Sequence, residues 1–375
     1  MKRLVICCDG TWQRMAGKRL TNVALTARAV AARDTEGRAQ IVYYSAGVGA
    51  SLDGFSLWQG MTAEDLDDHL ISAYQFLTLN YEPGDELFLF GFSRGAYTVR
   101  SLSGLLRKCG ILRRAHADKA EAALALYRKI DLRVDHPEAV AFREAHAAAW
   151  PQLDAMGLHQ VAARGPDAPR DLRIRYIGVW DTVGSLGIPR MLPVSLGFNR
   201  QYEFHDTALS RAVDYARHAV AIDEKRPAFA PTLWNNVHRF NREGERPRVL
   251  QTWFPGDHGC VGGGGVGEAR LLSNCALLWI LEGAEEAGLA LAREPGSVLS
   301  ACMAELDPVN GGLRARGEAF NIMNYLGARW RRGLSDFSDI NETARLRWIA
   351  DPRYRPLPLS RYRRRFDQMM NELVR

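Results

Sequence analysis

Long apolar segments are absent from this sequence of 375 residues. No stretch approaches the roughly 18 to 20 apolar residues that cross a bilayer, so we expect no membrane span. The amino terminus starts with basic residues, but the apolar run at 4–8 is far too short for a signal peptide and ends at Asp9. We therefore expect the protein to be made and folded in the cytoplasm.

Cysteine is sparse and is not spaced for metal binding. The six cysteines mostly lie in apolar surroundings and include no C-x-x-C pair: Cys7, Cys8, Cys109, Cys260, Cys275 and Cys302. Neither a zinc site nor a disulfide framework is indicated. The glycine run at 262–265 lacks the lysine and the Ser/Thr of a P-loop, so nucleotide binding is not expected. We expect no metal and no organic cofactor.

A large excess of one charge is also missing, since the net charge is only +6, but the charge is unevenly spread. Arginines crowd the last part of the chain: Arg329, Arg331, Arg332, Arg345, Arg347, Arg353, Arg355, Arg361, Arg363, Arg364 and Arg365. Such a segment could hold anionic lipid head groups or nucleic acid. No nucleic-acid-binding motif accompanies it, so we expect no nucleic-acid partner. We favour a solvated arginine face with aromatic residues packed beneath it, and keep an anionic membrane surface as the alternative.

The motif that points to chemistry is Gly-x-Ser-x-Gly, at Gly91, Ser93 and Gly95. An apolar run at 87–92 leads into it, and apolar residues at helical spacing follow it as far as Gly110. Strand, turn and helix in this order are typical of a nucleophile elbow, whose glycines let the backbone close a strained turn. We predict that Ser93 is a nucleophile. The alternative is a tight turn whose serine only caps the helix.

The elements around this motif alternate between strands and helices. Five apolar, β-favouring runs are predicted as strands: residues 4–8, 41–44, 87–92, 174–180 and 249–254. Helical patterns are predicted at 22–33, from Thr62 towards Pro83, after the elbow, and at 273–291. Most of the strands lack polar alternation, as strands covered on both faces do. The pattern predicts an α/β-hydrolase-like fold, a mostly parallel sheet with helices on both faces.

Two longer segments lie outside a minimal sheet. Residues 112–170 are rich in alanine and charge, and we expect them to form a largely helical insertion over the carboxyl edge of the sheet. We assign residues 1–290, insertion included, to one α/β-hydrolase domain. We expect residues 291–375 to form a helical, arginine-rich extension packed on that domain.

The loop at 184–199 is unusually apolar for a connection. Its apolar residues include Leu186, Ile188, Met191 and Leu192. An apolar loop near a candidate nucleophile indicates the wall of an acyl-chain pocket or a lid. Burial of the loop beneath the insertion is an equally good interpretation.

A serine nucleophile needs a histidine that takes its proton. In hydrolases of this fold the chain order is serine, acid, histidine, which eliminates His69. Of the later histidines, those at 116–159 fall in the insertion, and we expect His205, His218 and His238 in or beside helical or loop segments. His258 instead directly follows the strand 249–254, and ligands of open α/β sheets bind beyond the carboxyl ends of strands. We predict that His258 is the base.

Asp181 is the preferred acid, because it directly follows the strand 174–180 at another carboxyl end. Asp223 and Asp257 are its rivals. Asp257 is the weaker of the two, since it adjoins His258 in the sequence and neighbouring side chains usually point apart. The choice between Asp181 and Asp223 stays open.

The oxyanion formed on ester attack needs N–H donors. One is expected to be the backbone amide of Arg94, the residue after the nucleophile. For the second we select Gly10 or Thr11, which follow the first strand. Asp9 in the same segment suggests a phosphatase or metal site as a minor alternative, but no companion carboxylates with ligand spacing lie nearby.

Several blocks of the sequence together resemble a known family. They are CDGTW at 8–12, GFSRGAY at 91–97, GVWDTVG at 178–184, HA at 218–219 with IDE at 222–224, and WFPG at 253–256 with His258 and the glycines at 262–264. In this order they are similar to the DUF2235 family, the α/β-hydrolase domain found in phospholipase effectors of the type VI secretion system. The chain departs from the family in Gly259-Cys260, where Ser-Asp is usual, and in Gly265-Val266, where an aromatic residue is common.

The resemblance implies a lipase-type triad of Ser93, Asp181 and His258, cleavage of glycerophospholipid acyl esters, and export without a signal peptide through a type VI secretion system. We therefore predict a serine esterase of the phospholipase type that acts on lipid esters through an acyl-enzyme. One alternative is a hydrolase of small soluble esters or thioesters. Another is a non-catalytic protein on a decayed hydrolase scaffold, which binds a membrane or a secretion component.

Overall fold

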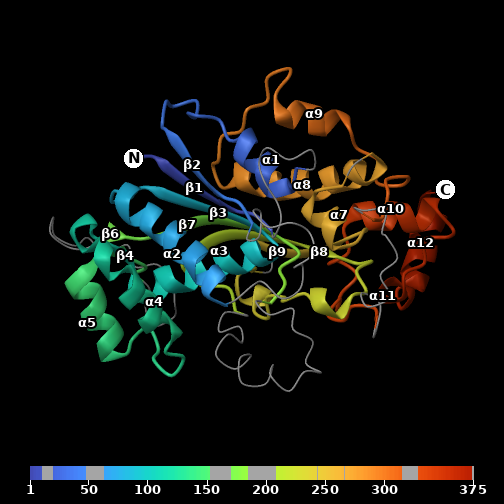
Figure 1. The fold of residues 1–375 in the computed structure, drawn as a ribbon. Helices are drawn as coiled ribbons and strands as arrows, with labels where there is room; N and C mark the ends of the chain where they lie inside the picture. The colour runs from blue at the N-terminus through green and yellow to red at the C-terminus, as the bar shows by residue number, and fades with distance from the viewer. Residues whose placement is uncertain are drawn as a thin grey trace, which may run out of the picture.

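Six parallel strands form the central sheet of the computed structural model, which describes residues 1–10, 20–47, 63–152, 170–184, 208–242, 244–265, 267–314 and 328–373 (Figure 1). Their order is β2 (Gln40–Ser45), β1 (Arg3–Cys8), β3 (Glu86–Phe92), β7 (Ile174–Trp180), β8 (Val213–Ala221) and β9 (Val249–Phe254). Every neighbouring pair is parallel, so the carboxyl ends of all six strands lie at one edge.

Helices cover both faces of this sheet. One face carries α2 (Ala63–Asn80) and α3 (Arg94–Cys109), and the other carries α1 (Asn22–Ala29) and α8 (Glu268–Glu286). Successive strand residues point to opposite faces. Leu4 and Ile6 accordingly pack with α2 and α3, whereas Val5 and Cys7 pack with α1 and α8. The predicted fold class, an α/β-hydrolase-like sheet with helices on both faces, is confirmed.

Strand β8 is the element that the sequence pattern did not indicate. We expected His218 in or beside a helix or loop, and this was wrong, because it lies inside β8. Polar residues interrupt the apolar pattern of the strand, yet each has a partner. Asp214 accepts hydrogen bonds from two arginines that precede or lie in β7, and Arg217 pairs with Glu282 and Glu286 of α8. Tertiary pairing therefore allows these charges in a central strand.

The described part of the insertion lies at the amino edge of the sheet, and not over the carboxyl edge as expected. It contains a small sheet of β4 (Ile111–Leu112), β5 (Ala147–Trp150) and β6 (Arg170–Asp171), the 3₁₀ turn Arg114–Lys119, and helices α4 (Ala120–Arg128) and α5 (Pro137–His146). Helix α3 starts at the carboxyl end of β3 and carries the chain back along the sheet, and β6 leads directly into β7. In Figure 1 this region lies beside the amino terminus.

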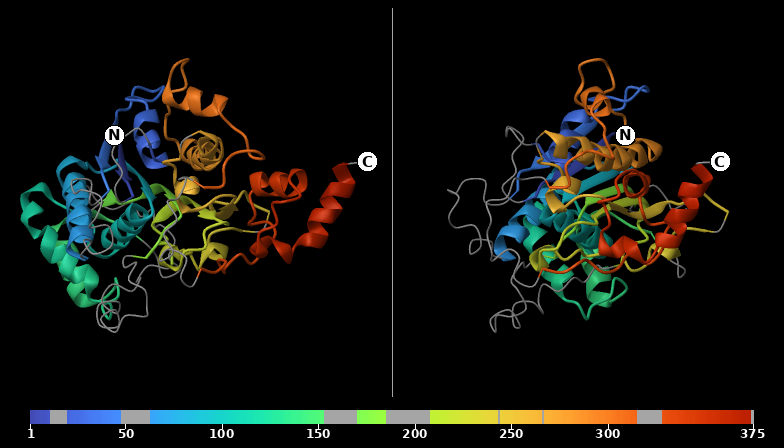
Figure 2. Two further views of the ribbon diagram at one scale, coloured as in Figure 1. Left: turned by 45° about the vertical axis from the view of Figure 1, so that its right-hand side comes forward. Right: turned by 90° about the vertical axis from the view of Figure 1, so that its right-hand side faces the viewer.

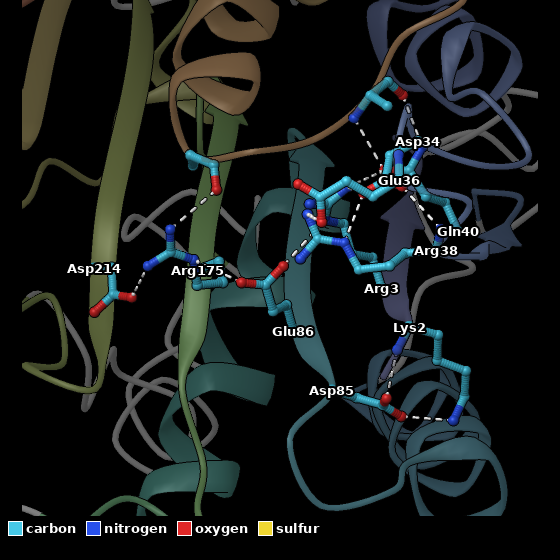
Figure 3. A network of polar contacts seen from close by, with 12 residues as sticks. Lys2, Arg3, Asp34, Glu36, Arg38, Gln40, Asp85, Glu86, Arg175 and Asp214 are labelled. Carbon is cyan, nitrogen blue, oxygen red and sulfur yellow. Dashed lines mark hydrogen bonds and ion pairs between the residues drawn. The ribbon is translucent and has the colours of Figure 1, made fainter. Parts of the chain in front are cut away.

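Charged side chains connect the strand starts at the amino edge (Figure 3). We call the set made of Lys2, Arg3, Asp34, Arg38, Asp85, Glu86, Arg175 and Asp214 the amino-edge network. Arg3 pairs with Asp34 at 2.9 Å and with Glu86 at 3.0 Å, and Lys2 Nζ lies 2.6 Å from Asp85. The network joins β1 to its neighbours on both sides, so it fixes the register of the strands where they begin.

The carboxyl-terminal segment, of which residues 305–314 and 328–373 are described, covers the outer edge of β9. It follows α9 (Val298–Ala304) and contains α10 (Glu342–Ala350), α11 (Leu357–Ser360) and α12 (Arg363–Leu373). Trp253 of β9 donates its amide to the carbonyl of Asp339 and accepts from the amide of Asn341. Its indole packs in one buried cluster with Ile340 and Trp348. Figure 2 shows these helices (red) beyond the strands.

The arginines of this segment do not form one solvated face. Most of them are exposed or half-buried, but Arg331 and Arg347 are buried. Arg347 donates to the carbonyl of Gly311. None of the helices in the described ranges is long and apolar enough to cross a membrane.

Candidate active site

Ser93 lies at the sharp turn between β3 and α3. Its φ of 57° is unusual for a residue with a side chain, and its hydroxyl forms no capping hydrogen bond with α3. The flanking glycines are required by close packing. A Cβ atom at Gly95 would lie 2.1 Å from the carbonyl oxygen of Cys8, and one at Gly91 would lie 2.7 Å from the amide nitrogen of Ala96. This is the geometry of a nucleophile elbow, and the helix-cap interpretation of Ser93 does not fit it.

His258 is the first residue of α7 (His258–Gly262), which follows β9 after a connection at 255–257. Its Nε2 lies 2.9 Å from Ser93 Oγ. The imidazole packs between the rings of Phe92 and Phe229, with centroid distances of 4.7 and 4.6 Å. The carboxylate of Glu224 accepts a hydrogen bond from the main-chain amide of His258 at 3.2 Å. Ring and backbone are thus both held, and the ring faces the serine.

Asp181 follows β7 and contacts the other nitrogen of the imidazole. Its Oδ2 lies 2.5 Å from His258 Nδ1, and its Oδ1 accepts the amide of Ala221 at 2.9 Å. The hydrogen bond to the carboxylate assigns the proton to Nδ1 and leaves the Nε2 lone pair for Ser93. Asp181 is fully buried and has a positive φ of 40°.

The two rival acids occupy other positions. Asp223 accepts hydrogen bonds from the amide of Gly256 at 2.7 Å and from the hydroxyl of Tyr354 at 3.0 Å, and burial raises its pKa to about 6. Asp257 caps α7 by accepting the amide of Cys260. Of the three candidates, the structure brings Asp181 to the His258 ring.

Arg331 contacts the candidate site, although the sequence predicts it to lie among the arginines of a solvated face. Its Nη1 donates to Asp181 Oδ1 at 2.5 Å and its Nη2 to Oδ2 at 2.8 Å. The same two nitrogens donate to the carbonyls of Ala221 and Phe229. Nothing in the sequence distinguishes Arg331 from its neighbours, since the contact joins residues 150 positions apart.

The ionisation of Asp181 reflects two opposed effects. Burial alone raises the pKa of a carboxyl group, because it disfavours the charged form. The charge of Arg331, with hydrogen bonds from His258 and from Arg331 itself, outweighs burial and holds the pKa of Asp181 well below its usual range. Asp181 is therefore a carboxylate near neutral pH.

His218 also belongs to this neighbourhood, although it does not contact the serine. Its Nε2 accepts the amide of Thr182 at 3.2 Å, and its Nδ1 lies 3.0 Å from Gln251 Oε1. Burial and the nearby charge of Arg100 lower its pKa to about 3, so the ring is neutral. It supports the turn that carries Asp181. Its place in the HA block at 218–219 was the one sequence signal for it.

The oxyanion candidates are only partly described. Arg94 is the first residue of α3, so its amide is one of the helix-start amides that have no acceptor within the helix. Gly10 lies against the elbow, where an added Cβ would be 3.4 Å from Ser93 Cβ, but its amide donates to Asp9 Oδ1 at 2.7 Å. Thr11 lies outside the described residues, as do Leu186, Ile188, Met191 and Leu192.

Asp9 is held by neighbouring hydroxyl groups. Thr21 and Tyr44 donate to its Oδ2, each at 2.6 Å. Burial raises the pKa of Asp9 to about 6 despite these hydrogen bonds. Within the described ranges no group of three or more His, Cys, Asp or Glu side chains could hold a metal ion.

An elbow serine at the carboxyl edge of a parallel sheet, with helices on both faces, defines the α/β-hydrolase-like class. A family model for the catalytic domain of the Tle1-like phospholipase effectors of the type VI secretion system matches residues 2–283. The chain belongs to this family.

The individual relatives share 28% sequence identity or less with this chain, and the chain covers only part of their length. An uncharacterized protein of Saccharomyces cerevisiae, YEL023C, is 28% identical over 244 residues, which cover 61% of this chain and 32% of the yeast protein. The crystal structure of an uncharacterized protein from Pseudomonas aeruginosa has a TM-score of 0.49 and 17% identity, and covers 82% of this chain and 49% of that one. The structure of the Tle1 effector bound to the VgrG spike has a TM-score of 0.34 and 15% identity, over 71% and 51% of the two chains. This chain thus spans about a third of the yeast relative and about half of the two solved chains.

Proposed function

We propose that this protein is a serine hydrolase of carboxylic esters of lipids, with Ser93 as nucleophile, His258 as general base and Asp181 as the acid that orients the base. The observation that carries the proposal is the 2.9 Å contact of His258 Nε2 with a serine hydroxyl that does not cap its helix. A neutral hydroxyl is a weak nucleophile, and a histidine at this distance can take its proton. The Asp181 carboxylate then stabilises the imidazolium.

In the proposed reaction, Ser93 Oγ attacks the ester carbonyl carbon while its proton moves to His258 Nε2. The alcohol leaves with that proton, and an acyl-enzyme remains. Water attacks the acyl-enzyme, gives a proton to His258, and the fatty acid departs as Ser93 recovers the proton. The amide of Arg94 is proposed as one oxyanion donor and that of Gly10 or Thr11 as the second. The Gly10 amide would have to leave Asp9 to serve.

Phospholipid acyl esters are the substrates that we propose first, because the chain belongs to a family of phospholipase effectors. Leu186, Ile188, Met191 and Leu192 are proposed as the apolar wall for the acyl chain. A small soluble ester or thioester is the alternative substrate. A decayed scaffold that only binds membrane is the alternative function.

Membrane contact and export are also part of the proposal. Arg363, Arg364 and Arg365 of α12 are exposed, and exposed arginines attract anionic lipid head groups. The solved Tle1 effector is bound to a VgrG spike, which makes a spike protein the partner to test for export through a type VI secretion system. Flotation with vesicles that contain phosphatidylglycerol tests the membrane contact: salt-sensitive binding supports it, and no binding at low salt contradicts it.

The test of the reaction compares the wild type with Ser93→Ala. We expect the wild type to release fatty acid from mixed phospholipid vesicles and to hydrolyse p-nitrophenyl butyrate, and Ser93→Ala to lose both activities by orders of magnitude. A fluorophosphonate probe should label the wild type and should not label Ser93→Ala. Ser101→Ala, on the same helix, is the matched control and should behave as the wild type. Equal rates for wild type and Ser93→Ala, or no labelling of the wild type, would contradict the proposal.

A further inference from the structure

We propose that Arg331 is a positioning residue for Asp181, so that a side chain from beyond the family-matched range 2–283 is required for turnover. The inference rests on the proposed hydrolase function. In this role Arg331, a buried arginine of the carboxyl-terminal segment, affects the reaction through the carboxylate of Asp181. It does not touch the substrate.

The guanidinium of Arg331 is held by hydrogen bonds on two sides. The planar guanidinium donates to both oxygens of Asp181, at 2.5 and 2.8 Å, which is the bidentate arrangement that lysine cannot form. The carbonyls of Ala221 and Phe229 hold the same two nitrogens from the other side. The Arg331 side chain is 4% exposed, and that of Asp181 is 0% exposed. The arginine therefore cannot exchange its partner for water.

The chain on either side of Arg331 is fixed as well. The amide of Arg329 donates to the carbonyl of Lys225, and the Lys225 ammonium lies 3.9 Å from the centre of the Trp330 ring. Two residues after the arginine, Gly333 packs against Leu233. Residues 329–333 thus lie along the loop that follows β8, and this docking delivers the guanidinium to the acid.

Arg331 also supplies the positive charge that keeps the buried Asp181 carboxylate ionised. A buried carboxylate without a counter-charge is expensive, and it either takes a proton or leaves its position. The resting His258 gives no full charge, since a neutral imidazole has to be ready to accept the serine proton. Without Arg331, burial would raise the pKa of Asp181, and a protonated Asp181 would no longer supply the negative charge that stabilises the imidazolium formed when His258 takes the serine proton.

The other charged groups around the acid do not replace Arg331. His218 of β8 is neutral, since burial and the charge of Arg100 lower its pKa to about 3. Glu224, which accepts the His258 amide, carries the sign of Asp181 and is paired with Arg226. Among the described residues, Asp181 contacts the imidazole of His258 and forms its ion pair with Arg331.

The first measurement compares Arg331→Met and Arg331→Lys by the pH dependence of kcat/KM on p-nitrophenyl butyrate. We expect Arg331→Met to lose roughly 100-fold in kcat, as misplaced catalytic groups do. We expect the acid limb of its pH profile to move up by about one pH unit or more, because Asp181 then takes up a proton. Arg331→Lys should recover part of both effects. Arg332→Met, at the exposed neighbouring arginine, is the control and should match the wild type.

A double-mutant cycle separates positioning from a merely structural role. If Arg331 acts through Asp181, Arg331→Met should cost little more in the Asp181→Asn background, as measured by the rate of fluorophosphonate labelling. An equal loss in both backgrounds, or an unmoved pH profile, overturns the inference. Should Arg331→Met fail to give a cooperative thermal melt, Arg331→Lys carries the same cycle.

The outcomes distinguish this inference from the function on which it rests. A wild type that cleaves no ester and takes no label removes the proposed function, and the inference with it. An active wild type with Arg331→Met at the wild-type rate removes the inference alone.

Discussion

Both edges of the sheet carry buried or half-buried charged side chains, but these side chains are connected differently at the two edges. In the amino-edge network, arginine, lysine and carboxylate side chains pair with one another and with main-chain groups, and solvent reaches many of them. At the carboxyl edge, a single chain of hydrogen bonds runs from Arg331 through Asp181 and His258 to Ser93. It ends at a hydroxyl group on a strained turn.

Charge pairing alone therefore does not identify a reactive site. In the amino-edge network, Arg3 pairs with Asp34 and Glu86, and such pairs hold neighbouring strands together. At the other edge, the contacts of Asp181 lead through one imidazole to Ser93 Oγ, the proposed nucleophile. The two edges differ in the group at which the chain of contacts ends. They also differ in how fully water is excluded from the charged side chains.

The largest expected effect comes from changing one carboxylate at each edge. We expect Asp181→Asn to lower kcat by about 10⁴-fold, because the amide holds His258 in the wrong tautomer. Asp214→Asn, in the amino-edge network, should keep the wild-type turnover, since Asp214 accepts hydrogen bonds from Arg173 and Arg175 at the opposite edge from Ser93. The measurement is ester hydrolysis under saturating substrate. Similar losses of turnover in the two variants would contradict the claim that only the carboxylate at the carboxyl edge is needed for the reaction.

A second, intermediate effect concerns acid stability at the carboxyl edge. The pKa of His218 is lowered to about 3, so in the folded protein the ring stays neutral well below the pH at which it protonates when unfolded. Between roughly pH 6.5 and 3 the unfolded chain binds a proton that the folded chain excludes, so the free energy of unfolding falls as the pH falls.

We expect this one group to remove about 2 kcal/mol between pH 7 and pH 5, and His218→Gln to lose that part of the pH dependence. Urea unfolding at the two pH values measures it. His238→Gln, at an exposed histidine, is the control and should keep the wild-type slope. A His218→Gln slope equal to that of the wild type would show that the buried ring is not the source.

The smallest expected effect is the stability cost at the amino edge. Asp214 is buried, but its partners Arg173 and Arg175 are partly exposed, with 45% and 27% of their side chains accessible. We expect Asp214→Asn to lower the free energy of unfolding by about 1 kcal/mol, and less in high salt, because screening weakens partly exposed pairs. Denaturant unfolding at low and high salt tests this. A loss that salt does not change would mean that desolvation, and not pairing, dominates.

The sequence predicted the parts of the fold that follow from local pattern. The elbow was recognisable because Gly91 and Gly95 are needed for one turn, and five strands because most of their residues are apolar. Asp181 and His258 were selected because each comes soon after the end of a strand, and parallel strands end at a common edge.

The remaining features depend on contacts between distant residues. Strand β8 was missed because Asp214 and Arg217 are tolerated only through partners on β7 and α8. The insertion was placed at the wrong edge because the length of α3 decides where the chain emerges. Arg331 could not be singled out, since only the docking of the carboxyl-terminal segment selects it from many similar arginines.

The pairing of Asp339 and Asn341 with Trp253 has a consequence for how the protein can be divided. The family match ends at residue 283, within α8, but the fold does not end there. A chain shortened to the matched range would leave the outer groups of β9 unpaired and the Trp253 indole uncovered. An unpaired apolar edge strand is a template for aggregation, so the shortened chain is expected to self-associate before its activity can be assayed.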